Sequence, residues 1–203
     1  MMEILLGIVI LLIAYVMGSI PFGLYVGRLW GKVDVRDHGS GNIGVSNVLR
    51  TLGPLPAVLV LALDAGKGAL PVLLARTVMP DSTWWLATGV AAIIGHNWPI
   101  LLQFKGGRGV ATTIGVLLTL APPVALALFI LWVFTLAISR YISLSSVLAA
   151  VALPLLIFLF GFPTTYLALG ILISIFVIYR HRPNIQRLLA GTEYKIGEKA
   201  RNN

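Results

Sequence analysis

Residues 4–26 read ILLGIVILLIAYVMGSIPFGLYV and contain no Asp, Glu, Lys or Arg. A helix of about 20 apolar residues crosses a bilayer, so this run is long enough to span one. The run is preceded by the acidic Glu3 rather than by basic residues, and it lacks the small-residue cleavage site of a signal peptide. We therefore predict a retained transmembrane helix.

The rest of the chain is equally apolar. Of its 203 residues, 58% are hydrophobic and 11% are charged, and the mean hydropathy is +0.95. Because about a quarter of the residues in soluble domains are charged, this composition excludes a water-soluble fold. We predict an all-α, multi-pass transmembrane bundle forming one domain over residues 1–203, with a tail at 180–203. Seven helices are expected, at residues 4–26, 54–78, 84–98, 110–121, 124–138, 146–160 and 165–179.

Several of these helices are shorter than a full span, and membranes tolerate short helices and polar loops only around a protein-lined cavity. The net charge of +8 arises from 15 Lys and Arg against 7 Asp and Glu. The basic residues, including Lys199 and Arg201 of the tail, fall on alternate connections, and only Arg76 lies beside a loop on the other side. The positive-inside rule then predicts an external N-terminus and a cytoplasmic tail. The charge is an orientation signal, and no nucleic-acid partner is expected.

The first polar connection holds the first glycine-rich segment, residues 37–50, with the sequence DHGSGNIGVSNVLR. Glycines allow positive φ and close approach of main-chain amides to an anion, small polar side chains add donors, and arginine offers a forked partner for phosphate. The alternative is an ordinary flexible loop, since Gly, Ser and Asn are common in turns. The candidate binding residues are Ser40, Gly41, Asn42, Gly44, Ser46, Asn47 and Arg50.

The second glycine-rich segment, residues 104–112, reads FKGGRGVAT and leads into the predicted helix at 110–121. Free amides and the positive dipole end of a helix, with two cations beside them, are typical of a phosphate site. The spacing is not that of a Walker A motif, so nucleotide hydrolysis is not supported. In the alternative interpretation, the cations only anchor the loop inside. The candidates are Lys105, Gly106, Gly107, Arg108 and Gly109.

Asp64 and Lys67 stand three residues apart inside the apolar helix predicted at 54–78. Charges within a membrane are costly and usually face a cavity or a partner. Two interpretations remain open, a mutually neutralising structural pair and a substrate-binding pair.

His96 closes the predicted third helix, and His181 and Asn184 open the tail. Either histidine is a candidate general base or phosphate ligand, although a histidine at a helix end is more often a capping or interface residue. Ser143, Ser145 and Ser146 stand at the start of the predicted helix at 146–160, and we interpret these serines as helix caps on the cytoplasmic side. Ser143 is also a candidate binding residue.

The three histidines are far apart in the sequence and no carboxylate pair accompanies them, so no metal and no cofactor are expected. Without Cys, the chain has no disulfide and no thioester-forming nucleophile. The candidate residues together predict a site for phosphate groups at the cytoplasmic surface.

These segments closely resemble the bacterial acyl-phosphate-dependent glycerol-3-phosphate acyltransferase family over nearly the whole chain. The resemblance rests on residues 18–23, 39–47 with Arg50, 64–68, 95–96, 104–112 and 181–193. It implies an inner-membrane enzyme of phospholipid biosynthesis that transfers an acyl chain from acyl phosphate to glycerol 3-phosphate, giving lysophosphatidic acid. It also implies that a soluble enzyme supplying acyl phosphate is a partner.

The resemblance assigns catalytic roles to Ser40, Arg50, Lys105, His181 and Asn184, and a structural role to Glu193. The family usually has Thr where this chain has Ser46, and Lys where it has Arg108; both changes keep the hydroxyl or the charge.

Acyl phosphate is a mixed anhydride with a good leaving group, so positioning and electrostatic stabilisation supply much of the rate without a covalent enzyme intermediate. In the absence of a convincing protein base, we hypothesise that the phosphate of glycerol 3-phosphate takes the proton. No histidine is followed by Asp five positions later, as in acyltransferases that use acyl coenzyme A or acyl carrier protein, so these are not the expected donors.

The main alternative is a transporter of small organic phosphates. Asp64 and Lys67 favour it, but no internal repeat is evident and the other candidates gather on loops of one face. A scaffold that binds a soluble partner through its basic tail would not explain the two glycine-rich segments.

Overall fold

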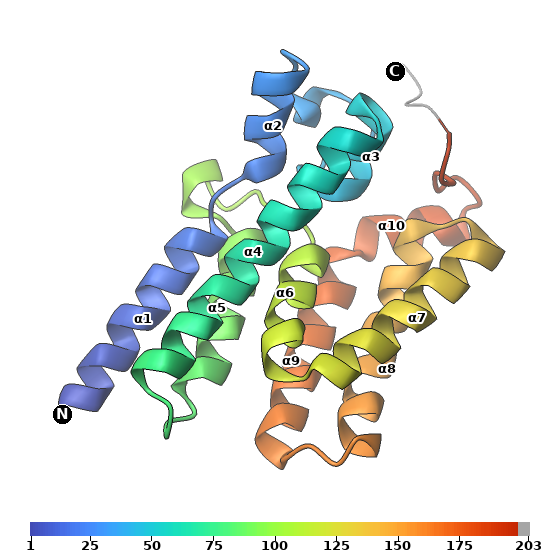
Figure 1. Cartoon of the computed structure of the whole chain (residues 1–203). Helices are drawn as coiled ribbons and strands as arrows, with labels where there is room; N and C mark the ends of the chain where they lie inside the picture. Colours follow the sequence, from blue (N-terminus) through green and yellow to red (C-terminus); the bar gives the residue numbers. More distant parts are fainter. Residues whose placement is uncertain (199–203) are drawn as a thin grey trace. The chain divides into compact units, whose positions relative to one another are not determined.

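The computed structural model describes residues 1–198, and these residues form helices joined by short connections (Figure 1). The tail positions Lys199 and Arg201 lie outside the described residues. The helices are α1 (Met2–Gly18), α2 (Phe22–Trp30), α3 (Val45–Leu52), α4 (Pro54–Val78), α5 (Trp84–Asn97), α6 (Val110–Leu120), α7 (Pro122–Ser139), α8 (Ile142–Leu159), α9 (Thr164–Arg180) and α10 (Arg182–Leu189), with 3₁₀ turns η1 (Val35–Asp37) and η2 (Ile100–Leu102). The prediction of an all-α fold is confirmed.

Five segments within the described residues are long and apolar enough to cross a membrane, and a sixth is formed if α9 and α10, bent by 58°, count as one span. Helix α6 is apolar but has only 11 residues. Large apolar side chains lie exposed on these helices, among them Leu12, Phe134 and Phe158. Because a soluble protein would bury such side chains, they fit a lipid-facing surface, and the multi-pass prediction is confirmed.

The single helix predicted over residues 4–26 is wrong in one respect, because the structure interrupts it between Gly18 and Phe22. Pro21 has no N–H to continue the helical ladder. At the start of the break, the Ser19 hydroxyl donates to the Tyr15 carbonyl (2.8 Å). The apolar composition continues across the break, which is why hydropathy alone does not reveal it.

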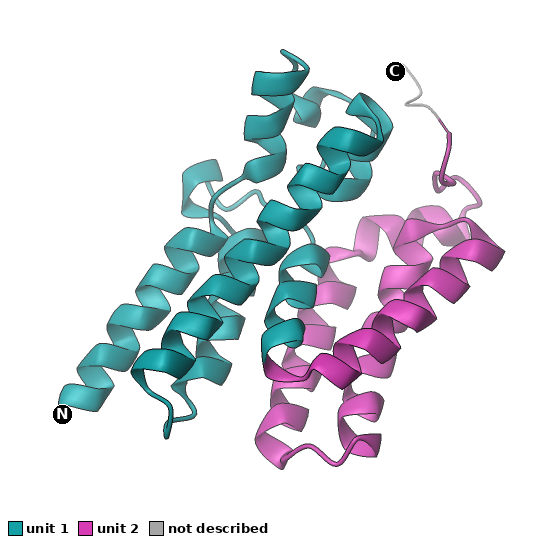
Figure 2. Ribbon diagram, viewed as in Figure 1, with its two compact units in different colours: residues 1–119, 199–203 teal, residues 120–198 magenta. Residues whose placement is uncertain are grey.

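The described residues form two compact units, 1–119 and 120–198, coloured separately in Figure 2. In the first unit, α1, α4 and α5 pack together. The main chains of these helices approach one another closely at two glycines. A Cβ on Gly18 would lie 2.2 Å from the carbonyl oxygen of Ala92, and a Cβ on Gly95 would lie 2.2 Å from the carbonyl oxygen of Tyr15. Such small residues let membrane helices pack backbone to backbone.

A separate apolar core in the first unit joins α2, η1, α3 and α4. Its buried members are Leu24, Val26, Val35, Ile43, Val48, Ala57 and Val60. In the second unit, α8 packs against both α7 and α9. There, the buried Ser174 hydroxyl donates to the Ala150 carbonyl (2.5 Å), which links α9 to α8.

Candidate active site

The first glycine-rich segment is organised by one buried amide, that of Asn47. Its Nδ2 donates to the carbonyls of Val35 (2.7 Å) and His38 (3.1 Å), and its Oδ1 accepts from the main-chain N–H of Ser40 (2.8 Å). Gly39 has a φ of +59°, and a Cβ there would lie 2.5 Å from Asn47 Oδ1. The Asn47 side chain therefore shapes the segment from within.

The turn continues to the start of α3. The Asn42 side chain accepts from the Gly44 N–H (2.7 Å), and Gly44 is the N-cap residue of α3. The first N–H groups of a helix have no partner within it and suit an anion. Ser46 and Arg50 lie on α3, both half-buried, as is Ser40 in the turn before it.

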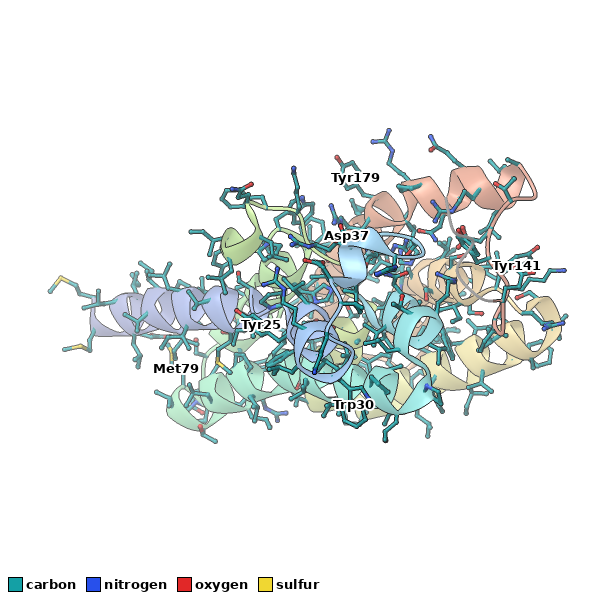
Figure 3. All side chains as sticks on the ribbon, turned by 90° about the horizontal axis from the view of Figure 1, so that it is seen from above. Tyr25, Trp30, Asp37, Met79, Tyr141 and Tyr179 are labelled. Atoms are coloured by element: carbon teal, nitrogen blue, oxygen red, sulfur yellow. The ribbon has the colours of Figure 1, made fainter. Side chains whose placement is uncertain are left out.

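An ion-pair cluster precedes this turn. Asp34 accepts from Arg36 (2.6 and 2.9 Å) and from Arg28 (3.1 Å), and it also caps η1 through the Arg36 N–H. These hydrogen bonds, chiefly that from the Arg36 side chain, hold the pKa of the Asp34 carboxyl well below its usual value. Asp37, labelled in Figure 3, ends η1 and is exposed.

The second glycine-rich segment rests on the C-terminal end of α5. The Gly107 N–H donates to the His96 carbonyl (3.0 Å). A Cβ on Gly106 would lie 2.2 Å from the His96 carbonyl oxygen, and a Cβ on Gly107 would lie 2.0 Å from Nε2 of the His96 ring. Only glycine allows this approach. Lys105 stands at the exposed side of the segment, and Arg108 is half-buried.

The segment then enters α6 through Gly109, whose φ is +79°. A Cβ on Gly109 would lie 2.8 Å from Asn97 Oδ1. Asn97 is fully buried, and its amide atoms make no hydrogen bond within the described residues; the same is true of the Thr112 and Thr113 hydroxyls on α6. Buried polar atoms normally bond to protein, water or ligand, so this region beneath the segment has hydrogen-bonding capacity left.

Asp64 and Lys67 form an ion pair within α4, with 2.7 Å between Lys67 Nζ and Asp64 Oδ1. His96 Nδ1 lies 3.8 Å from the same carboxylate oxygen. Lys67 also donates to the Ile20 carbonyl (2.7 Å) in the break between α1 and α2. The structure thus brings Asp64, Lys67 and His96 together, and this geometry favours the structural interpretation of the pair.

In the second unit, His181 joins α9 to α10 and is buried. Its Nδ1 lies 2.8 Å from the Val177 carbonyl oxygen. A carbonyl only accepts, so Nδ1 carries the proton, and in the neutral ring Nε2 is the acceptor nitrogen. This tautomer suits a residue whose Nε2 receives a proton or a hydrogen bond.

Glu193 connects two residues of α10. It accepts from Asn184 Nδ2 (2.7 Å) through one oxygen and from Arg187 Nε (2.7 Å) through the other. Asn184 is thereby fixed, while its Oδ1 makes no hydrogen bond among the described residues. The contacts of Glu193 are those of a supporting residue.

The prediction that Ser143, Ser145 and Ser146 cap a helix beginning at residue 146 is wrong, because α8 already begins at Ile142. Ser145 and Ser146 donate back to the carbonyls of Tyr141 (3.0 Å) and Ile142 (2.9 Å), as hydroxyls within a helix do. The Ser143 hydroxyl is buried and makes no hydrogen bond among residues 1–198. Tyr141, the residue before α8, is labelled in Figure 3 and lies under the Lys195 ammonium.

The predicted site residues are thus distributed over both units. The first unit holds both glycine-rich segments with Asp64, Lys67 and His96; the second holds Ser143, His181, Asn184 and Glu193. Within residues 1–198, no group of three His, Asp or Glu side chains is arranged to hold a metal ion.

Two residues near the candidates escaped the sequence analysis. Arg187 follows Asn184 by three positions, a spacing that places both on one helical face, and both donate to Glu193. Asn97 is the last residue of α5 and directly follows His96. An amide in an apolar helix next to a histidine is a usable signal, because buried polar groups need partners.

Comparison with known proteins decides the family. A family model described as glycerol-3-phosphate acyltransferase matches residues 8–191. The chain belongs to the glycerol-3-phosphate acyltransferase family. The family membership expected from the sequence is confirmed, and the protein is a membrane acyltransferase.

Curated family members are similar over nearly their full length. The chain is 50% identical over 186 residues to a glycerol-3-phosphate acyltransferase of Synechococcus sp. (strain JA-3-3Ab), covering 91% of each chain. It is 46% identical to one of Halalkalibacterium halodurans, covering 96% of this chain and 97% of that one. A crystal structure of PlsY (YgiH), an integral membrane glycerol 3-phosphate acyltransferase in its glycerol 3-phosphate form, is 43% identical with a TM-score of 0.89, covering 94% and 96% of the two chains.

Proposed function

We propose that the protein transfers a fatty acyl group from acyl phosphate to glycerol 3-phosphate, forming lysophosphatidic acid and phosphate for phospholipid biosynthesis. The observation that carries the proposal is the pair of glycine-rich segments of the first unit, each combining glycines packed closely against neighbouring atoms with cationic residues. Both substrates carry phosphate, and such segments suit two anionic groups. A solved relative is titled as the lysophosphatidic acid form of PlsY, which fits the proposed product.

In the proposed reaction, a glycerol hydroxyl attacks the acyl carbonyl carbon. The new carbon–oxygen bond forms, the bond to the phosphate oxygen breaks, and inorganic phosphate leaves with the electron pair. The hydroxyl proton passes to the phosphate of glycerol 3-phosphate, so no protein base is required. Glycine-rich amides stabilise the negative charge on the carbonyl oxygen.

The residue roles proposed for this reaction follow the sequence analysis. Ser40, Arg50, Lys105, His181 and Asn184 act at the reacting groups, with Arg50, Lys105 and Arg108 offsetting phosphate charge. Ser143 and the polar candidates other than Asp64 and Lys67 bind substrate, and Glu193 holds Asn184 in place (2.7 Å). The hydrogen bond from His181 to Val177, which fixes the tautomer, supports a role for Nε2.

The setting of the reaction is part of the proposal. We propose one acyltransferase domain over residues 1–203, supported by a family model that runs through both units. It lies in the bacterial inner membrane with an external N-terminus and a cytoplasmic active site, supported by the placement of its Lys and Arg. A soluble enzyme that makes acyl phosphate is the proposed partner.

The test is a donor comparison with purified protein in lipid. Glycerol 3-phosphate is offered with acyl phosphate, acyl coenzyme A or acyl carrier protein thioester, and lysophosphatidic acid is measured. The proposal expects product with acyl phosphate alone. Product with thioesters only would overturn the donor, and folded protein inactive with every donor would favour the phosphate transporter.

A further inference from the structure

The buried pair Asp64 and Lys67 is unusually enclosed for charges inside a membrane helix. Their side chains are 2% and 3% exposed, and they lie 2.7 Å apart. Neither side chain is open to a ligand of any size. Since an intramembrane ion pair is costly, each charged group needs compensating contacts, and these contacts indicate what the pair does.

Lys67 reaches the interruption of the first apolar run. Its ammonium donates to the Ile20 carbonyl (2.7 Å) and lies 5.6 Å from the Phe22 ring centroid. Pro21 follows Ile20 and contributes no N–H, and the Ile20 carbonyl also accepts from the N–H of Phe22 (3.1 Å), the first residue of α2. The Lys67 ammonium supplies a charged donor at the point where the chain turns from α1 into α2.

The course of α2 matters for the first glycine-rich segment. Gly23, in the first turn of α2, touches the Ile43 carbonyl so closely that a Cβ there would lie 1.8 Å from its oxygen. Ile43 lies between the candidate residues Asn42 and Gly44. A shift of α2 at the break would therefore move the main chain of this segment.

Asp64 contacts His96, on which the second glycine-rich segment packs. Its carboxylate lies 3.8 Å from His96 Nδ1. The His96 carbonyl accepts from the Gly107 N–H (3.0 Å), and its ring fills the space that a Gly107 side chain would need. The position of His96 thus sets the position of this segment.

We propose that Asp64 and Lys67 are positioning residues for acyl transfer: Lys67 fixes the first glycine-rich segment through Ile20 and α2, and Asp64 fixes the second through His96. One ion pair in α4 holds the main chains of both segments, without touching substrate. The inference rests on the proposed function, in which these main chains bind the phosphates. An error of about 1 Å in such a site costs on the order of 100-fold in rate.

Replacing Asp64 and Lys67 together tests their positioning role without leaving one buried charge uncompensated. A buried ion pair replaced by apolar residues of similar size often leaves stability unchanged, whereas removal of one partner leaves an uncompensated charge. The variant is D64L/K67M, and a neutral polar variant, D64N/K67Q, retains weaker hydrogen bonds. Arg76→Met is the matched control, because Arg76 is a second α4 cation that donates to a main-chain carbonyl, that of Thr119 (2.6 Å).

Two readouts are made on the full-length protein in lipid. The first is kcat and KM for glycerol 3-phosphate per folded enzyme; the second is hydrogen exchange of residues 39–47 and 105–110 without substrate. We expect D64L/K67M to lose about 10- to 100-fold in kcat/KM and to exchange faster in both segments, D64N/K67Q to lose severalfold, and the control to match wild type.

A folded D64L/K67M with wild-type kinetics and exchange would overturn the inference. Where D64L/K67M does not fold, D64N/K67Q decides: a severalfold loss with faster exchange in both segments supports positioning, and wild-type values in both readouts overturn it. Hydrogen exchange requires no turnover, so an inactive wild type would contradict the proposed function while leaving this inference measurable.

Discussion

The replacement Gly106→Ala tests the packing of the second glycine-rich segment on α5. A Cβ at this position would lie 2.2 Å from the His96 carbonyl oxygen and 2.7 Å from that of Asn97. Ordinary contacts to a Cβ begin near 3.4 Å. These two oxygens are main-chain atoms at the end of α5, and Pro99 Cδ would lie 2.3 Å away as well. The glycine-rich segment therefore has to move, by roughly 1 Å.

A displacement of this size predicts a loss of about 100-fold in kcat/KM for glycerol 3-phosphate. Overpacking of a well-packed site costs about 1–3 kcal/mol of stability, so the melting temperature in detergent is expected to fall while the protein still folds. The matched control is Gly66→Ala in α4, where a Cβ would meet nothing within 4 Å. Alanine is the better helix former, and this variant is expected to keep activity and to be as stable or slightly more so.

The assay measures initial rates of lysophosphatidic acid formation at varied glycerol 3-phosphate, normalised to folded protein. Wild-type kinetics in Gly106→Ala, with the control also normal, would refute the reasoning that this segment is held in place by its contact with α5. An equal loss in the Gly66→Ala control would show that the assay reports helix perturbation in general.

Three further predictions concern single side chains. Asn47→Ala removes three hydrogen bonds and leaves the Ser40 N–H without its acceptor, so we expect the free energy of unfolding to fall by about 2–4 kcal/mol and the activity to fall as well. A denaturation midpoint like that of wild type would contradict the role given to the Asn47 side chain. Glu193→Ala frees both Asn184 and Arg187 and should lower kcat more than Glu193→Gln, which can still accept from Asn184; equal kinetics in the two variants would exclude support through Asn184. The depressed pKa of Asp34 means that its contribution to stability is present above about pH 3.9, the unfolded value, and is lost as the pH falls through the lower folded pKa. Its partners Arg28 and Arg36 have side chains that are 55% and 43% exposed, so Asp34→Asn should lower the free energy of unfolding by less than about 1 kcal/mol at neutral pH. Melting curves from pH 3 to 7 that show a larger loss of stability would contradict the assignment of a surface ion pair.

The sequence predicts well the helices that have strong terminal signals. The span expected at 54–78 coincides with α4, because Gly53, with a φ of +89°, and Pro54 mark its start. The sequence does not reveal the break at Pro21, because the apolar composition continues through it. It also does not reveal the early start of α8, because serines occur both as helix caps and in the first turn of a helix. Short helices such as α3 and α10 lie in polar stretches, where hydropathy gives no signal.

For the candidate site, sequence identifies residue types and local spacing but not partners remote along the chain. The contact between Asp64 and Lys67 follows from their spacing on one helix. The carbonyl of Ile20, 47 residues from Lys67, and the packing of Gly107 on His96 depend on the tertiary fold. These contacts turn two apparently separate motifs into a connected support.

The most direct test of the central claim is the stoichiometry of one reaction. Purified protein in liposomes is given acyl phosphate and glycerol 3-phosphate, and lysophosphatidic acid and inorganic phosphate are measured together, with spontaneous hydrolysis subtracted. The account predicts one phosphate released for each lysophosphatidic acid formed, with no thioester present. Phosphate release without lysophosphatidic acid, or no reaction in folded protein, would contradict it.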